Sequence, residues 1–155
     1  MSEVQTEGFP KILVGIDGSE ASIDASRYAI DIAKKYNSQL IALFVIHIHG
    51  IRSVSSTFIT APTSGIELYE KEKREAQEFL GKVRLEAQRE NVELRTEIVE
   101  GSASVEGSIV DYAESEGTSL IVVGTRGKTG FKRLLLGSVA SGVISYAHCP
   151  VMVVK

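Results

Sequence analysis

Residues 120–138 have the sequence LIVVGTRGKTGFKRLLLGS, in which a short apolar run leads into a loop rich in glycine and cations. The β-branched run at 120–123 predicts a buried strand, and residues 139–148 predict a helix with Ser138 as its N-cap. Glycine lets an anion approach the backbone closely, and the dipole of the following helix favours negative charge at its N-terminus. The stretch therefore predicts a phosphate-binding loop.

Charge is distributed unevenly along the chain. No acidic residue follows Glu116, and the part from residue 117 onward holds five cations, four of them in the loop at Arg126, Lys128, Lys132 and Arg133. This asymmetry favours anion binding in the C-terminal part. The net charge of the whole chain is −3, and no basic stripe interleaved with aromatic residues is present, so we expect no nucleic-acid partner. A glycine-rich turn with an ordinary solvated basic face is the alternative.

Two well-known phosphate motifs do not fit the loop. A Walker A motif that ends at Gly127-Lys128-Thr129 requires glycine at position 122, where the chain has valine. The three-glycine fingerprint of dinucleotide-binding folds does not follow the first strand either. The spacing that the loop does contain is Gly124, two residues, Gly127, nine residues, and Gly137-Ser138.

Strand-like and helix-like patterns alternate along the whole chain. Apolar runs predict strands at 11–17, 39–46, 92–100, 120–123 and 150–155, and helical periodicity predicts helices at 20–36, 66–91, 105–116 and 139–148. This alternation predicts a single-domain, Rossmann-like α/β fold, with an open five-stranded parallel sheet in the order 3-2-1-4-5 and helices on both faces. In that order Asp17 and Gly124 face each other across the crevice where the winding reverses, which is the usual ligand site of such sheets.

Length and composition limit the classes of protein to consider. The 155 residues suit one domain, which we place at 10–155 after a loose tail at 1–9. The chain contains no apolar stretch of about 18 residues, no N-terminal signal region and one cysteine, Cys149, so we expect a cytoplasmic protein without a membrane partner. The polar connection at 47–65 is long enough to suggest a function, and we expect it to cover a ligand.

These motifs resemble the universal stress protein family over residues 11–155. The resemblance rests on the glycine spacing, on the opening Ile12–Ser19, on Gly101 and on the ending His148–Val154. It implies that Asp17 contacts a nucleoside and that Val45 and Val123 wall the adenine. It also implies that Gly127, Gly137, Ser138 and Val139 hold the phosphates through backbone N–H groups and the hydroxyl.

The resemblance implies an ATP-binding regulatory or stress-response module, with Mg²⁺ or Mn²⁺ bound through the phosphates and with a protein partner that the sequence does not identify. It also implies a homodimer. We expect the dimer to form through Pro150 to Lys155, because an apolar last strand at a sheet edge invites pairing with another chain. The expected nucleotide-binding residues are Gly15, Ile16, Asp17, Val45, Val123, Gly124, Arg126, Gly127, Gly137, Ser138 and Val139.

Several alternatives stay open at this stage. The protein is alternatively a slow ATP hydrolase or a phosphotransferase, although the loop offers no evident general base. A flavodoxin-like electron carrier is a third class, disfavoured by the absence of tryptophan. The alternative role of Asp17 is to cap the turn before the first helix. The alternative for Arg126 is that it is an ordinary solvated surface residue. His47 and His49 form either a metal-ligand pair or, more commonly, a loop edge.

Overall fold

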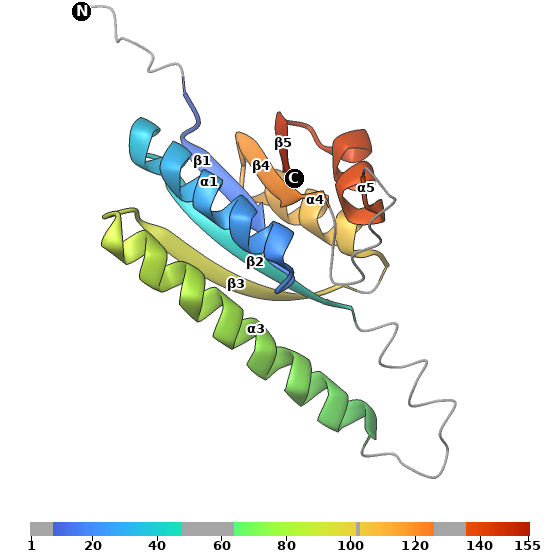
Figure 1. The fold of residues 1–155 in the computed structure, drawn as a ribbon. Helices are drawn as coiled ribbons and strands as arrows, with labels where there is room; N and C mark the ends of the chain where they lie inside the picture. Colours follow the sequence, from blue (N-terminus) through green and yellow to red (C-terminus); the bar gives the residue numbers. More distant parts are fainter. Residues whose placement is uncertain (1–7, 48–63, 102, 126–135) are drawn as a thin grey trace, which may run out of the picture.

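The structure of the chain is a computed structural model that describes residues 8–47, 64–101, 103–125 and 136–155. Five strands form one parallel sheet in the order β3-β2-β1-β4-β5, which confirms the predicted topology (Figure 1). The strands are β1 (Lys11–Gly15), β2 (Gln39–His47), β3 (Leu94–Gly101), β4 (Leu120–Gly124) and β5 (Val151–Val154).

Helices cover both faces of the sheet, as predicted. Helices α1 (Glu20–Tyr36) and α3 (Ser64–Arg89) lie on one face, and α4 (Val105–Ser115) and α5 (Ser138–Tyr146) lie on the other (Figure 1). Successive residues of a strand point to opposite faces, so Ile12 and Val14 pack under α1 and α3 while Leu13 packs under α4 and α5. The central strands are therefore apolar almost throughout.

The ends of three helices show how local sequence sets their boundaries. The side chain of Ser19 caps α1 by accepting a hydrogen bond from the Ser22 N–H at 3.1 Å, and Ser104 caps α4 in the same way. Asn37 ends α1 in the left-handed region at a φ of 54°, which confirms the predicted stop. The predicted N-cap of α5 was wrong. The cap is Gly137, and Ser138 is already the first helical residue.

The first strand is also shorter than expected. It ends at Gly15 instead of Asp17, although the Ile16 N–H still donates to the Leu43 carbonyl at 2.8 Å. The reason is that the Asp17 N–H donates to the Ser22 Oγ at 3.3 Å, so the chain has turned toward α1 at that residue. Asp17 consequently lies in the β1–α1 turn.

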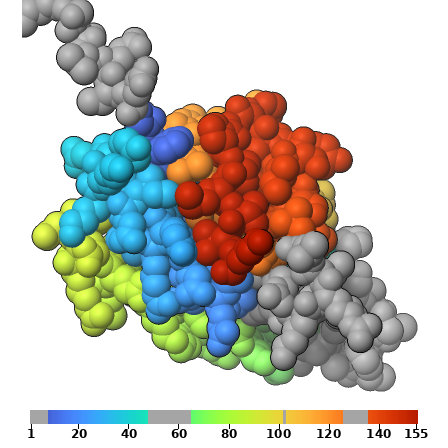
Figure 2. Space-filling view, turned by 45° about the horizontal axis from the view of Figure 1, so that its top comes forward, coloured from blue at the N-terminus to red at the C-terminus, as the bar shows by residue number. Residues whose placement is uncertain are grey.

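The two sheet edges differ in their surroundings. Strand β3, in which apolar and charged residues alternate, is half-exposed along most of its length. Strand β5 is the other edge, and Figure 2 shows the C-terminal segment, in dark red, at the surface beside the blue α1.

At the start of the described chain, the Phe9 ring packs edge to face against the Tyr36 ring, with 5.6 Å between the ring centroids. Among the described helices, none is both long and apolar enough to cross a membrane.

Candidate functional site

The candidate site lies at the carboxyl ends of β1 and β4, the two neighbours where the winding of the sheet reverses. Gly15 and Val123 lie next to each other there, because a Cβ added to Gly15 would be 3.5 Å from the Val123 Cγ1. The chain then continues into the Asp17 turn on one side and into the glycine loop on the other. The sheet thus brings together segments that lie more than a hundred residues apart in the sequence.

Asp17 is half-buried and helps to shape its own turn. Its Oδ1 accepts a hydrogen bond from the Ser19 N–H at 2.8 Å, and the Ser22 Oγ donates to the Ser19 carbonyl at 2.9 Å. The capping role considered for Asp17 is therefore present. A carboxylate accepts several hydrogen bonds, so this role is compatible with a ligand contact as well.

The ends of the glycine loop are joined at the base of the site. The Gly137 N–H donates to the carbonyl of Thr125, and the Thr125 N–H donates to the Val154 carbonyl at 2.8 Å. Thr125 is buried and links β4, β5 and the entry to α5. Sequence reasoning missed this residue, although a threonine directly after a buried strand was a signal for it. Arg126 and Gly127, which carry predicted ligand contacts, lie outside the described residues.

The N-terminus of α5 faces this junction. Gly137 is extended at a φ of −71° and a ψ of 165°, and its N–H donates to the Thr125 carbonyl. Among the residues that the structure describes, no side chain caps the helix there, and the Ser138 side chain is exposed. The first N–H groups of a helix have no partner within the helix, so an uncapped end is suited to bind an anion.

Apolar residues line the adjoining face of the sheet. Val45 and Val123, which we predict to wall the adenine, belong to one cluster beneath α4 and α5, and Val139 packs against the same cluster. The same cluster includes three half-buried residues that sequence reasoning had not assigned to the site: Val99, Val105 and Leu136. Val99 was recognisable as the apolar end of an otherwise polar strand face. Ile16 faces the opposite cluster, under α1 and α3.

The histidine pair gains no support as a metal site. The His47 ring lies 3.2 Å from the Ala103 carbonyl through its Nε2, and His49 lies outside the described residues. Within the described residues, no group of three or more His, Cys, Asp or Glu side chains is placed to hold a metal. Residues 47–65, which we expect to cover a ligand, also lie mostly outside the described residues.

Two further features lie outside the site. Cys149 is half-buried just before the last strand, at the opposite end of the sheet, and burial raises the pKa of its thiol. A groove of about 670 Å³ runs between α1 and α3, and its lining includes Gly18, Arg27, Phe79 and Leu85. The groove extends to the Asp17 turn, where Gly18 forms part of its lining.

The fold is that of a doubly wound α/β protein, and the carboxyl ends of β1 and β4 form the edge where sheets of this class usually bind ligands. A family model described as "Universal stress protein family" matches residues 8–155, and the chain belongs to that family.

Individual relatives agree with this assignment. The chain is 44% identical over 149 residues to universal stress protein MJ0531 of Methanocaldococcus jannaschii, covering 95% of this chain and 82% of the relative. It is 35% identical to universal stress protein YxiE of Bacillus subtilis, covering 95% and 99% of the two chains. The solved structure of universal stress protein UspA from Lactobacillus plantarum superposes with a TM-score of 0.82 at 27% identity, covering 96% of this chain and 99% of the other.

Proposed function

We propose that this chain binds ATP in the crevice between the Asp17 turn and the start of α5, and that it acts as a nucleotide-dependent regulatory or stress-response module in the cytoplasm. The observation that carries the proposal is the junction of Thr125 and Gly137. Their hydrogen bond directs the two ends of the glycine loop to an uncapped helix N-terminus at the carboxyl end of β4.

The residues present fit an adenine nucleotide. The cluster containing Val45 and Val123 supplies an apolar surface for the base, and the Asp17 carboxylate supplies a hydrogen-bond acceptor for the nucleoside. Gly127, Gly137, Ser138 and Val139 are assigned to the phosphates, and Arg126 is assigned to charge attraction. A Mg²⁺ or Mn²⁺ ion would be bound through the phosphates, because the described residues hold no cluster of protein ligands for it.

Relatives that share the fold point to the same ligand class. One solved universal stress protein is a complex with cAMP, and another, from Archaeoglobus fulgidus, is a complex with dAMP. At 21% and 22% identity these structures establish a shared fold with this chain. Their adenine nucleotides are carried over here only as part of the proposal.

The proposal is tested by identifying nucleotide released from the purified protein on gentle denaturation, and by titrating the nucleotide-free protein with ATP and Mg²⁺ in a calorimeter. Gly137→Val and Gly127→Val should abolish binding, because a branched side chain blocks backbone approach to the phosphates. Gly81→Ala is the matched control, since a Cβ at Gly81 in α3 has no neighbour within 4 Å. Unchanged affinity in both valine variants would refute the site.

We further propose a homodimer joined through β5. The Ile121 N–H donates to the Pro150 carbonyl at 3.0 Å, and the Thr125 N–H donates to the Val154 carbonyl at 2.8 Å. Because pairing groups alternate along a strand, the peptide groups of Val151 and Val153 face outward. An outward-facing edge of this kind can pair with a second copy about a two-fold axis.

A further inference from the structure

Helix α3 contributes an aromatic ring to the back of the Asp17 turn. Gly18 has a φ of +85°, and a Cβ added to it would lie 2.4 Å from the Phe79 Cε2 and 2.8 Å from two other ring carbons. The ring therefore fills the space that a side chain at position 18 would occupy. Glycine is required here twice, by its backbone conformation and by this contact.

The turn on the other side of Gly18 is a small hydrogen-bonded unit. Asp17 accepts from the Ser19 N–H, and Ser19 in turn accepts from the Ser22 N–H through its hydroxyl. Gly18 is the one residue of this unit without a side chain, and glycine populates positive and negative φ almost equally. The Phe79 ring lies against this residue from outside the turn and so limits its movement.

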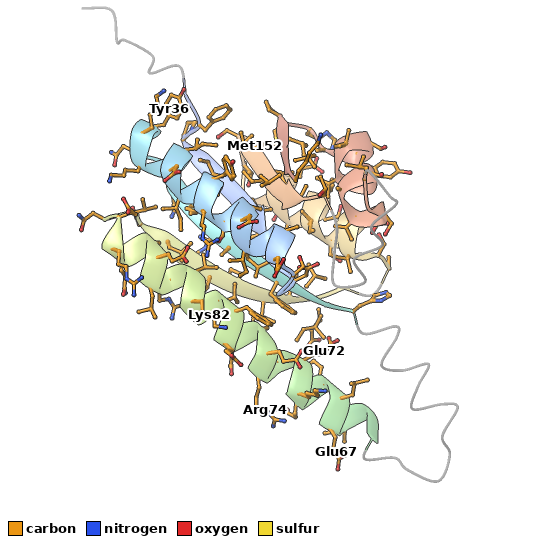
Figure 3. All side chains as sticks on the ribbon, viewed as in Figure 1. Tyr36, Glu67, Glu72, Arg74, Lys82 and Met152 are labelled. Atoms are coloured by element: carbon orange, nitrogen blue, oxygen red, sulfur yellow. The ribbon has the colours of Figure 1, made fainter. Side chains whose placement is uncertain are left out.

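Phe79 is itself held firmly. Its ring packs against the core cluster beneath α1 and α3, and the Lys82 Nζ lies 5.4 Å from the ring centroid. Figure 3 shows Lys82 on α3. Two ion pairs between α1 and α3 lie farther from the turn, Arg27 with Glu86 and Lys34 with Glu90. These pairs are exposed, and exposed ion pairs constrain a structure weakly.

We infer that Phe79 is a positioning residue for the nucleotide site, because its ring holds Gly18 at positive φ and thereby orients the Asp17 carboxylate toward the crevice. The inference rests on the proposed function for the part that concerns nucleotide. It links the long helix α3, from which none of the predicted site residues comes, to the affinity of that site. This coupling between Phe79 and the site involves neither the movement of a charged group nor a covalent step.

Calorimetric titration with ATP and Mg²⁺ tests the coupling in a double-mutant cycle. Phe79→Ala and the milder Phe79→Leu should weaken binding, by about tenfold for alanine, and the loss should fall below about twofold when Asp17→Asn is already present. Leu80→Ala is the matched control, since Leu80 is 4% exposed on the same helix and belongs to the same cluster. It should lower the unfolding midpoint and leave ATP affinity unchanged.

A second measurement needs no nucleotide. Amide hydrogen exchange of the Ser19 N–H, followed by NMR, should quicken about tenfold in Phe79→Ala while the exchange of β1 amides stays as in the wild type. The inference would be overturned if Phe79→Ala lowered ATP affinity by the same factor in the wild type and in Asp17→Asn. An unchanged Ser19 exchange rate in Phe79→Ala would also overturn it. A wild type that binds no ATP, combined with faster Ser19 exchange in Phe79→Ala, would refute the proposed function and leave the positioning of the turn supported.

Discussion

Gly124 at the end of β4 lies against Ala21 in the first turn of α1, so closely that an added Cβ would be 2.7 Å from the Ala21 carbonyl carbon and 2.9 Å from its oxygen. The sequence predicted this glycine as part of a phosphate loop. In the structure, position 124 has no room for a side chain, because α1 packs across the sheet at this point. The contact brings the Asp17 turn and the start of the glycine loop to the same edge.

Gly124→Ala should lower the free energy of unfolding by about 1–3 kcal/mol, because the Ala21 backbone cannot move aside for a methyl group. Urea denaturation followed by circular dichroism measures the change. Gly15→Ala is the matched control one strand away, since its Cβ would meet Ile109 and Val123 at 3.5 Å, an ordinary contact distance. Equal stability of the two variants would show that the Gly124 contact is looser than described.

A polar network joins three elements at the opposite end of the sheet. The Arg95 Nη2 lies 2.6 Å from the Glu116 Oε1, and the Lys11 Nζ lies 3.6 Å from the Glu116 Oε2. The hydrogen bond from Arg95 is the main cause that lowers the pKa of Glu116 below its ordinary value of 4.5. Arg95 also donates to the Tyr112 hydroxyl at 3.2 Å.

The lowered pKa predicts a pH-dependent contribution of Glu116 to stability. A carboxyl with a pKa that is lower in the folded state stabilises the protein above its unfolded-state pKa, and this contribution is lost as the pH falls through the folded-state pKa. The stability difference between wild type and Glu116→Gln should therefore be largest near about pH 7 and shrink below about pH 4.5. Denaturation at several pH values measures it.

The proposed dimer predicts a specific effect of proline in β5. Val153→Pro removes one outward N–H and keeps the hydrogen bonds to β4, so it should give folded monomer in sedimentation velocity experiments. Val153→Thr has a similar shape and retains the N–H, so it should remain dimeric. Val151→Lys, on the same side of the strand, should also weaken association. A wild type that sediments as a monomer at about tens of micromolar, with and without ATP, would contradict the β5 dimer.

Turnover of bound ATP should be slow. No carboxylate follows Glu116 in the sequence, and Asp17 already accepts a hydrogen bond within its own turn. We therefore expect phosphate release well below the ~10 s⁻¹ typical of enzymes, measured with a continuous phosphate assay. Brisk release that disappears in Asp17→Asn would instead place this protein among ATP hydrolases.

Helical periodicity predicted most of the buried residues of both α3 and α1. Ala76, Leu80 and Val83 are buried on α3, and Ala25, Ala29 and Ala33 are buried on α1. Two tyrosines with the same helical spacing on α1 differ from this pattern, because Tyr28 is 55% exposed and Tyr36 is 42% exposed. The small Ser26 is buried there instead, and its hydroxyl donates to the Ile23 carbonyl at 2.6 Å. Figure 3 shows Tyr36 near the N-terminal end of the described chain and Met152 between β5 and α1.

The sequence by itself determined the order of strands and helices, the parallel sheet and the glycine loop before α5, because these depend on hydrophobic periodicity and on local backbone preferences. Only the tertiary structure decided that Ala21 excludes a side chain at Gly124, that Phe79 holds Gly18, and that Thr125 joins Gly137. Each of these contacts depends on how elements pack or how a loop closes in space. Local preference cannot specify which atoms meet there, because their distances follow from the packing of the whole sheet and its helices.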